Sequence, residues 1–159
     1  MLSLKYPLSF FLLCLAGFVT VFGFGLANPF LPIYAQELGA SETMIGVIMS
    51  SYFITRLFLE LPSGLISDRI GRRIPMLLGM LLTGTGAALS SIATFPLVLL
   101  VSRAIWGSGT CLFFSSSVAL LFDIFQPADR GKATGAFQSL EFIGRVIGAP
   151  LGGIVAEIM

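Results

Sequence analysis

The 159-residue sequence contains no histidine, and charged residues make up only 11% of it. The lack of histidine excludes histidine-ligated metal sites and catalysis in which an imidazole is the acid or base. A soluble domain carries about a quarter charged residues. Because this chain carries less than half of that share, and because 56% of its residues are hydrophobic, the composition indicates an integral membrane protein.

Cysteine is also scarce. Cys14 and Cys111 lie in apolar stretches and form no closely spaced pair, so we expect two buried packing residues rather than a disulfide or a zinc site. The sequence shows no nucleophile motif and no pair of acids in an aqueous loop. It therefore gives no support to an enzyme, and we expect no metal, no other cofactor and no nucleic-acid partner.

Five apolar stretches are long enough to cross a bilayer, and they predict an all-α integral membrane protein with a single transmembrane domain over residues 1–159. The predicted spans are about 7–34, 43–66, 75–92, 95–122 and 133–157. The first, roughly 40 Å long as a helix, exceeds a bilayer core of about 30 Å, so a tilt or a kink is expected at Asn28-Pro29 and Pro32. It is also too long for a cleaved secretory signal. Ser41 is the predicted N-cap of the second span.

The basic residues of the predicted loops all fall on one side of the membrane. These are Lys5, Arg69, Arg72, Arg73, Arg130 and Lys132. The loops on the other side, near 36–42 and 93–95, contain no lysine or arginine. The positive-inside rule therefore predicts a cytoplasmic N-terminus and places the C-terminus outside.

The densest charge lies between the second and third spans, in Gly64-Leu-Ile-Ser-Asp68-Arg69-Ile-Gly71-Arg72-Arg73. One acid, three arginines and two glycines stand here between apolar stretches. Because charge of this density cannot lie in hydrocarbon, we expect a tight turn at a membrane surface. The spacing G-x-x-x-D-R-x-G-R-R closely resembles the signature loop between the second and third helices of the major facilitator superfamily.

Further motifs follow in the order of that family. In the fourth span Arg103, Gly107 and Gly109 are similar to its pattern of an arginine followed by glycines, and Asp123 with Arg130 resembles a repeat of the signature loop. The fifth span resembles a glycine motif that is prominent in antiporters. Its matching residues are Gly144, Gly148, Pro150, Gly152 and Gly153. Ala149 departs from that pattern, which weakens an assignment as an antiporter.

The resemblance implies a helical bundle of the family type and secondary active transport of a small solute by alternating access. It implies that Asp68, Arg72 and Asp123 form a latch between the two halves of the transporter on the cytoplasmic side. Gly64 and Gly71 would permit close helix approach and a tight turn. The alternative is that the arginines only set the topology. Because the chain has five spans of the family's twelve, it lacks the C-terminal half as a partner, and we expect that it does not transport by itself.

Charged residues also lie inside the predicted spans. They are Arg56, Glu60, Arg103, Glu141 and Arg145. Each costs about 2.5–3.5 kcal/mol at a helix centre, so they should face a bundle interior or a watery cavity. Arg56/Glu60 and Glu141/Arg145 are spaced i,i+4 and could neutralise one another. Arg56 and Glu141 lie at a similar depth, about 15 Å from the inner ends of their helices, so a pair between helices is conceivable.

Two interpretations of these charges stay open. They could line a translocation path, with Glu60 or Glu141 coupling protons and an arginine contacting an anionic group, or they could be structural pairs. Asn28 is a further cavity candidate, with capping of a helix break as its alternative.

Two classes of function therefore compete. One is the N-terminal part of a proton- or ion-coupled carrier in the cell (plasma or inner) membrane. Such a carrier would be an antiporter or a symporter, and drug efflux is one activity that fits it. The other is a short membrane protein that oligomerises or serves as a non-transporting scaffold or receptor.

Overall fold

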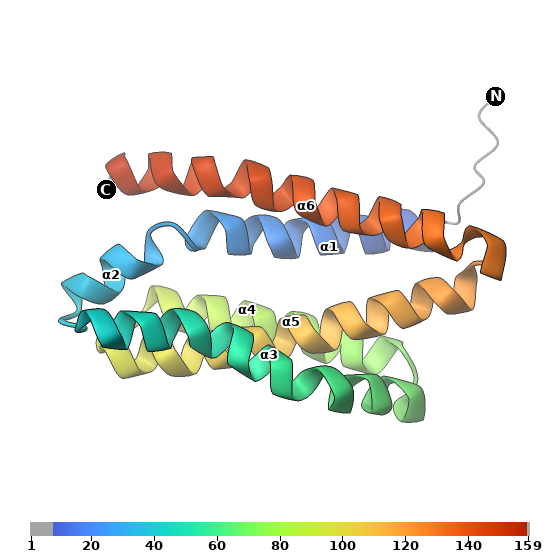
Figure 1. Cartoon of the computed structure of the whole chain (residues 1–159), viewed down its shortest axis with the longest axis horizontal. Helices are drawn as coiled ribbons and strands as arrows, with labels where there is room; N and C mark the ends of the chain where they lie inside the picture. The colour runs from blue at the N-terminus through green and yellow to red at the C-terminus, as the bar shows by residue number, and fades with distance from the viewer. Residues whose placement is uncertain (1–7, 159) are drawn as a thin grey trace. The chain divides into compact units, whose positions relative to one another are not determined.

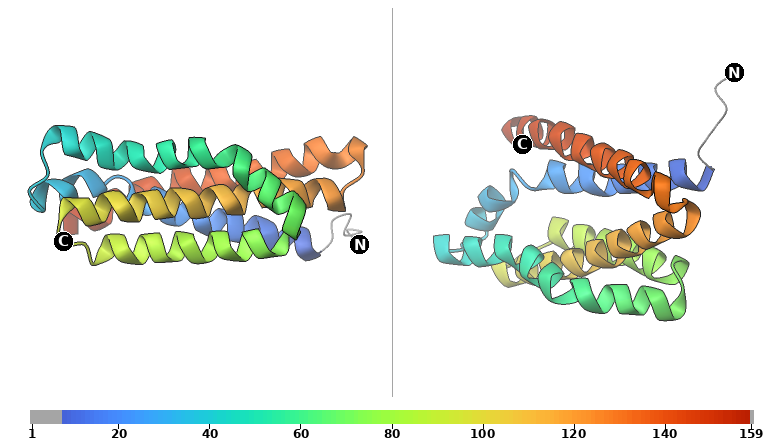
Figure 2. Two further views of the ribbon diagram at one scale, coloured as in Figure 1. Left: turned by 90° about the horizontal axis from the view of Figure 1, so that it is seen from below. Right: turned by 45° about the vertical axis from the view of Figure 1, so that its right-hand side comes forward.

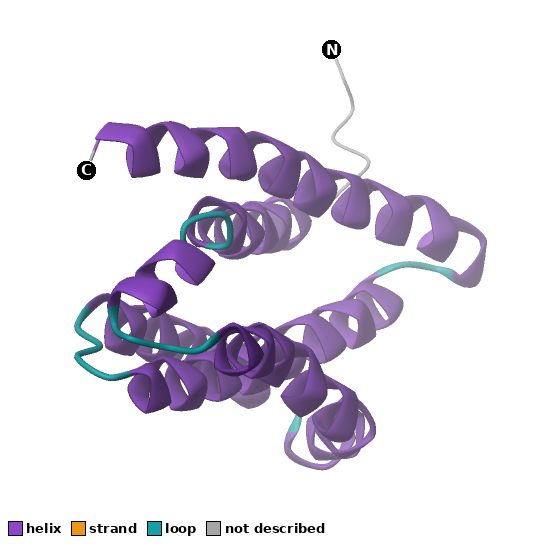
Figure 3. Cartoon of the chain, turned by 60° about the vertical axis from the view of Figure 1, so that its left-hand side comes forward, coloured by secondary structure: helices purple, strands orange, loops and turns teal. Residues whose placement is uncertain are grey.

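The structure is a computed structural model, and it describes residues 8–158. These residues form helices joined by short loops (Figures 1 and 3). The helices are α1 (Leu8–Ala27), α2 (Leu31–Glu37), α3 (Glu42–Ile70), α4 (Arg73–Ser91), α5 (Pro96–Ile124) and α6 (Pro127–Ile158). The described part of the chain contains no strand. The predicted all-α class is confirmed.

Within residues 8–158, four helices are long and apolar enough to cross a membrane, namely α1, α3, α4 and α5. The sequence predicts a fifth span over 133–157. The corresponding helix, α6, has 32 residues but carries charges along its length, including Lys132, Glu141 and Arg145. The fifth span therefore stays a prediction, and so does the topology that follows from it.

The first predicted span is two helices rather than one. A turn at residues 28–30 separates α1 from α2, and Pro32 lies in the first turn of α2. Pro29 has no N–H for a helical hydrogen bond and disfavours helical geometry at Asn28, so the break follows from the local sequence. The expected kink is confirmed. The Tyr34 hydroxyl of α2 donates a hydrogen bond of 2.6 Å to the Ala93 carbonyl oxygen, in the loop between α4 and α5.

The ends of α3 differ in how well the sequence defines them. Ser41 caps the start as predicted, because its Oγ accepts a 3.3 Å hydrogen bond from the Met44 N–H. At the other end the helix continues through Asp68 to Ile70, so the turn is much shorter than the predicted Gly64–Arg73 segment. Only Gly71 and Arg72 separate α3 from α4. Gly71, at φ +85° and ψ 165°, adopts a conformation open essentially to glycine alone.

Two more features of the helices depend on proline. Pro62 lies inside α3, and Figure 2 shows that this helix bends in its second half, as expected where a proline removes a backbone hydrogen bond. The last helix begins at Pro127 rather than at residue 133. Proline is well suited to the first helical position, where no intrahelical donor is required. Arg130 and Lys132 therefore belong to the start of α6 and not to a loop.

The chain forms two compact units. One contains α1, the end of α5 from Leu121, and α6, which runs along α1 (Figure 1). The other contains α2, α3, α4 and the rest of α5, with α5 between α3 and α4 (Figure 2). In this second unit the glycines of α5 permit close approach: a Cβ at Gly107 would lie 2.4 Å from the Tyr52 carbonyl oxygen of α3, and one at Gly109 would lie 2.4 Å from the Thr83 nitrogen of α4.

Candidate functional site

The turn between α3 and α4 is built around one ion pair. The Arg72 guanidinium, through Nη1, contacts the Asp68 carboxylate four residues earlier and lies 3.4 Å from Ser67 Oγ, to which it donates. Ser67 is buried, whereas the Asp68 side chain is largely exposed. Arg72 therefore closes the end of α3 while the carboxylate of Asp68 stays open to another partner.

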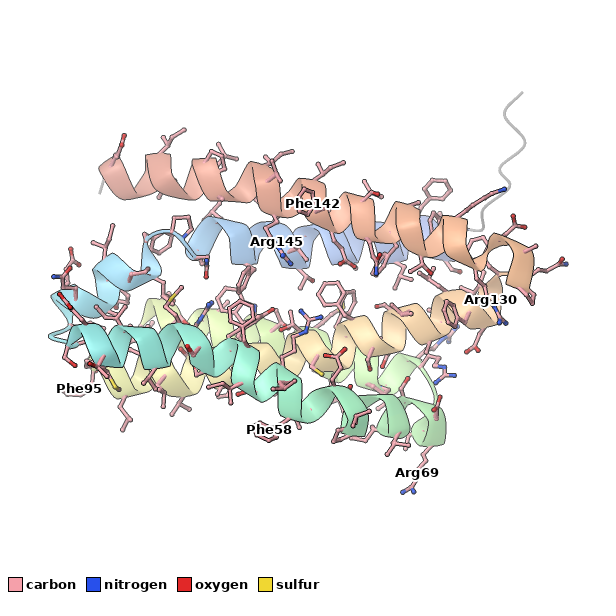
Figure 4. All side chains as sticks on the ribbon, viewed as in Figure 1. Phe58, Arg69, Phe95, Arg130, Phe142 and Arg145 are labelled. Carbon is pink, nitrogen blue, oxygen red and sulfur yellow. The ribbon has the colours of Figure 1, made fainter. Side chains whose placement is uncertain are left out.

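The other members of the signature segment are arranged differently. Arg69 and Arg73 are exposed, and Figure 4 shows Arg69 extending away from the end of α3. Gly64 lies inside α3, and a Cβ there would meet no described atom within 4 Å. Within residues 8–158 the structure therefore assigns a special backbone conformation to Gly71 but no close helix contact to Gly64.

Asp123 and Arg130 lie at the turn between α5 and α6 (Figure 4 labels Arg130). Arg130 Nε donates a 3.2 Å hydrogen bond to the Phe125 carbonyl oxygen, and its guanidinium lies 5.3 Å from the centre of the Phe122 ring. This turn belongs to the unit of α1 and α6, whereas Asp68 belongs to the unit of α3. The predicted cluster of Asp68, Arg72 and Asp123 remains a prediction.

A polar cluster joins the middle of α3 to α5. Arg56 Nε lies 3.5 Å from Glu60 Oε2, so the predicted i,i+4 pair forms. The guanidinium carbon of Arg56 lies 5.7 Å from the centre of the Phe114 ring. The side chains remain accessible, at 33% for Arg56 and 52% for Glu60. This is an ion pair with one open side, at mid-length of a helix that can span a membrane.

Buried polar side chains lie directly behind this pair. The Cys111 thiol donates to Glu60 Oε2 over 3.6 Å, and Ser63 Oγ lies 3.4 Å from Cys111 Sγ. Ser63 also donates to Ser115 Oγ at 3.0 Å. Cys111 and Ser63 are almost completely buried. The predicted burial of Cys111 is confirmed, but its thiol also contacts a carboxylate and therefore contributes more than packing.

Arg103 is the one embedded charge that is fully buried, among the five that the sequence analysis singled out. Its guanidinium carbon lies 5.1 Å from the centre of the Tyr52 ring of α3 and 5.5 Å from that of Trp106, one turn further along α5. Both distances allow a cation–π attraction. Because a Cβ at Gly107 would lie 2.4 Å from the Tyr52 carbonyl oxygen, Arg103 lies where α3 and α5 approach each other closely.

The second embedded pair has another arrangement. Glu141 of α6 is half-buried beside α1, where a Cβ at Gly17 would lie 3.6 Å from its Cγ. Arg145, labelled in Figure 4, is exposed. Asn28 is half-buried in the turn between α1 and α2. The predicted pair of Arg56 with Glu141 joins residues of different units, so it also remains a prediction.

The glycine motif of α6 lies against the backbone of α1. Added Cβ atoms at Gly144, Gly148 and Gly152 would approach the carbonyl oxygens of Phe18, Phe22 and Leu26 to 2.9, 2.5 and 2.0 Å. Three glycines at intervals of four form one face of a helix, and here that face lets two backbones meet directly. The other two members of the motif differ: Pro150 is exposed, and a Cβ at Gly153 would meet no described atom within 4 Å.

Comparison with known proteins agrees with this architecture. The sequence profile of the Major Facilitator Superfamily matches residues 13–159. The chain belongs to this superfamily. Similar relatives include the quinolone resistance protein NorA of Staphylococcus aureus, 24% identical over 141 residues, and multidrug resistance protein 1 of Bacillus subtilis, 30% identical over 141 residues. Each alignment covers 89% of this chain but 36% of the relative.

This member of the superfamily is accordingly a multi-pass membrane protein. The chain spans about a third of the length of the curated relatives it matches. Sequence reasoning did not identify the row formed by Ser63, Cys111 and Ser115, nor the ring of Phe114 beside Arg56. The only available signal was that Cys111 and Ser115 are spaced i,i+4 on one helix face. Nothing in the sequence indicated that this face meets Glu60.

Proposed function

We propose that the chain is the N-terminal part of a secondary active transporter that moves a small solute across the membrane by alternating access. The observation that carries this proposal is the open ion pair of Arg56 and Glu60. Exposed charges in the middle of a membrane helix are costly against lipid, so their open side should face a bundle interior or a water-filled cavity. A path through the protein provides that environment, as the superfamily assignment supports.

The direction of transport that we propose is efflux, driven by protons. The relatives named for quinolone and multidrug resistance support efflux as the direction. Glu141 is the proposed proton carrier, because it is a half-buried acid of α6 beside α1. A carboxylate in such a place can take up and release a proton as its surroundings change from wet to dry. Glu60 is the second candidate, although it already faces Arg56.

The signature turn is the proposed cytoplasmic gate. Asp68 and Arg72 are held together at the end of α3, and the exposed side of Asp68 is available to a partner. Asp123 is the proposed second acid of the latch within the chain, paired to Arg72 rather than to Asp68, and the C-terminal half of a complete carrier is the proposed partner outside the chain. Separation of these charge-assisted contacts would open the cytoplasmic side.

The test is transport by the protein at its full genomic length, reconstituted in lipid vesicles with an imposed pH gradient. A quinolone and the organic cation ethidium serve as test solutes. We expect gradient-driven flux that is lost in Glu141→Gln and retained in Glu157→Gln, because Glu157 is exposed near the end of α6. Full gradient-driven flux in Glu141→Gln would remove Glu141 from the mechanism. Failure of the wild type to move any tested solute, at normal protein levels in the vesicles, would favour a non-transporting scaffold.

A further inference from the structure

We propose that Glu60 and Phe114 form a binding place for the positive charge of an amphipathic organic cation, and that Arg56 occupies this place as a tethered substitute when no solute is bound. The inference rests on the proposed transport function and specifies the class of solute. Its structural basis is that one guanidinium lies against both a carboxylate and an aromatic ring.

The two groups around Arg56 share one chemical preference. A carboxylate attracts any cation, and the face of a benzene ring attracts cations through its quadrupole. Glu60 is held toward this place from behind, because the Cys111 thiol donates to the same Oε2 that faces Arg56. Phe114 is fixed by burial on α5. The anionic and aromatic walls are thus in position without movement of the helices.

Arg56 is held loosely enough to be displaced. Its contact with Glu60 is a single long one of 3.5 Å rather than a bidentate pair, and its distance to the Phe114 ring, 5.7 Å, is close to the limit of about 6 Å for cation–π attraction. Arg103 provides the contrast on the next helix. It is fully buried and lies nearer to both of its rings, so no solute can replace it without separating α3 from α5.

The accessible side of the pair determines what the solute must be. Glu60 and Arg56 lie about 15–21 Å from the Ile70 end of α3, at 1.5 Å per residue, so the solute must leave bulk water to reach them. The neighbouring exposed side chains on α3 are apolar, among them Phe53 and Leu57. A compound with one delocalised positive charge and apolar groups around it satisfies both conditions. An anion would instead be repelled by the carboxylate of Glu60.

Equilibrium binding to the purified full-length protein in detergent, without any gradient, tests this inference. The probes are tetraphenylphosphonium and tetraphenylborate, which have nearly the same shape and opposite charge. We expect Arg56→Gln to tighten phosphonium binding up to about fivefold, the upper end of the range for removal of a partly exposed ion-pair partner. Glu60→Gln should weaken it at least tenfold. Lys132→Gln, an equal change of charge at the exposed start of α6, should leave it unchanged.

Several outcomes would overturn the inference. These are unchanged or weaker phosphonium binding in Arg56→Gln, equal tightening of both probes, or the same gain in Lys132→Gln. Binding of phosphonium by neither the wild type nor Arg56→Gln would overturn it as well. If Arg56→Gln does not elute as a folded species, Phe114→Leu decides. It should weaken phosphonium binding several-fold, whereas Phe58→Leu, on the exposed face of α3 in Figure 4, should not, and equal effects would refute the site.

The two proposals fail separately in these assays. Suppose that the protein transports solutes in vesicles, but that phosphonium binding is neither tighter in Arg56→Gln nor weaker in Glu60→Gln than in the wild type. The transport function is then retained and the Glu60–Phe114 site is refuted. A protein that binds phosphonium in the expected order but moves no solute retains the site and loses the proposed transport.

Discussion

Replacement of Gly152 by alanine should separate α1 from α6. A Cβ at this position would lie 2.0 Å from the Leu26 carbonyl oxygen, 2.8 Å from its carbonyl carbon and 3.1 Å from its Cα. The first distance is about 1.4 Å shorter than ordinary van der Waals contact. All three atoms belong to the backbone, so no rotamer change can relieve the clash. Overpacking of a close contact costs typically about 1–3 kcal/mol.

Gly153, the next residue, is the matched control. A Cβ there would meet no described atom within 4 Å, so alanine adds no clash and removes some of the backbone freedom of glycine. We therefore expect Gly152→Ala to lower the apparent melting temperature of the full-length protein in detergent by several degrees. Gly153→Ala should leave it unchanged or raise it slightly.

The comparison isolates packing, because both variants add the same methyl group to the same helix one residue apart. A melting temperature of Gly152→Ala equal to that of the wild type would show that α6 does not lie against α1 as described. A larger loss in Gly153→Ala than in Gly152→Ala would show that the helix presents a different face. Either result would refute the assignment of Gly144, Gly148 and Gly152 to one contact surface.

Two further predictions concern the turn between α3 and α4. Asp68→Asn should reduce flux through the full-length protein in vesicles more than Arg69→Gln does. Its melting temperature should stay nearly constant, because an exposed i,i+4 pair contributes about 0.3–0.5 kcal/mol, and a large loss of stability with normal flux would contradict the gate. Gly71→Ala should lower the melting temperature, because the conformation at φ +85° costs other residues about 1–3 kcal/mol. Gly131→Ala, in open space within α6, should not lower it, and equal melting temperatures of the two variants would refute the strained turn.

The features that the sequence predicted well are local ones. Apolar runs placed the helices, the Asn28-Pro29 dipeptide placed the break between α1 and α2, and Ser41 marked the start of α3. Each depends on residues within one or two turns, where the spacing itself determines the hydrogen bonds. The turn at the signature segment lies within the predicted segment but is shorter, because the charged residues Asp68 and Arg69 continue α3 and only Gly71 and Arg72 separate it from α4.

The features that the sequence did not predict depend on which helix faces meet. Gly152 and Gly153 are adjacent residues of the same type, yet Gly152 lies against the backbone of α1 and Gly153 faces open space. The i,i+4 spacing indicated that Arg56 could reach Glu60, but not that Cys111 and Phe114 complete the cluster from α5. Such contacts depend on the rotation of one helix against another, which a hydrophobic pattern specifies only coarsely in a membrane, where lipid and protein interior are alike apolar.

Burial separates the roles of residues that looked equivalent as embedded charges. Arg56 and Arg103 both lie against aromatic rings on the α3–α5 contact, but Arg103 is fully buried at the point where Gly107 meets the Tyr52 backbone. A solute cannot replace a charge that is buried in this way. The contacts of Arg103 instead hold α3 and α5 together. Arg56 has an accessible side and a partner that is accessible too. Of the two arginines, only Arg56 is therefore included in the proposed solute site, where it would give its place to a solute and recover it after release.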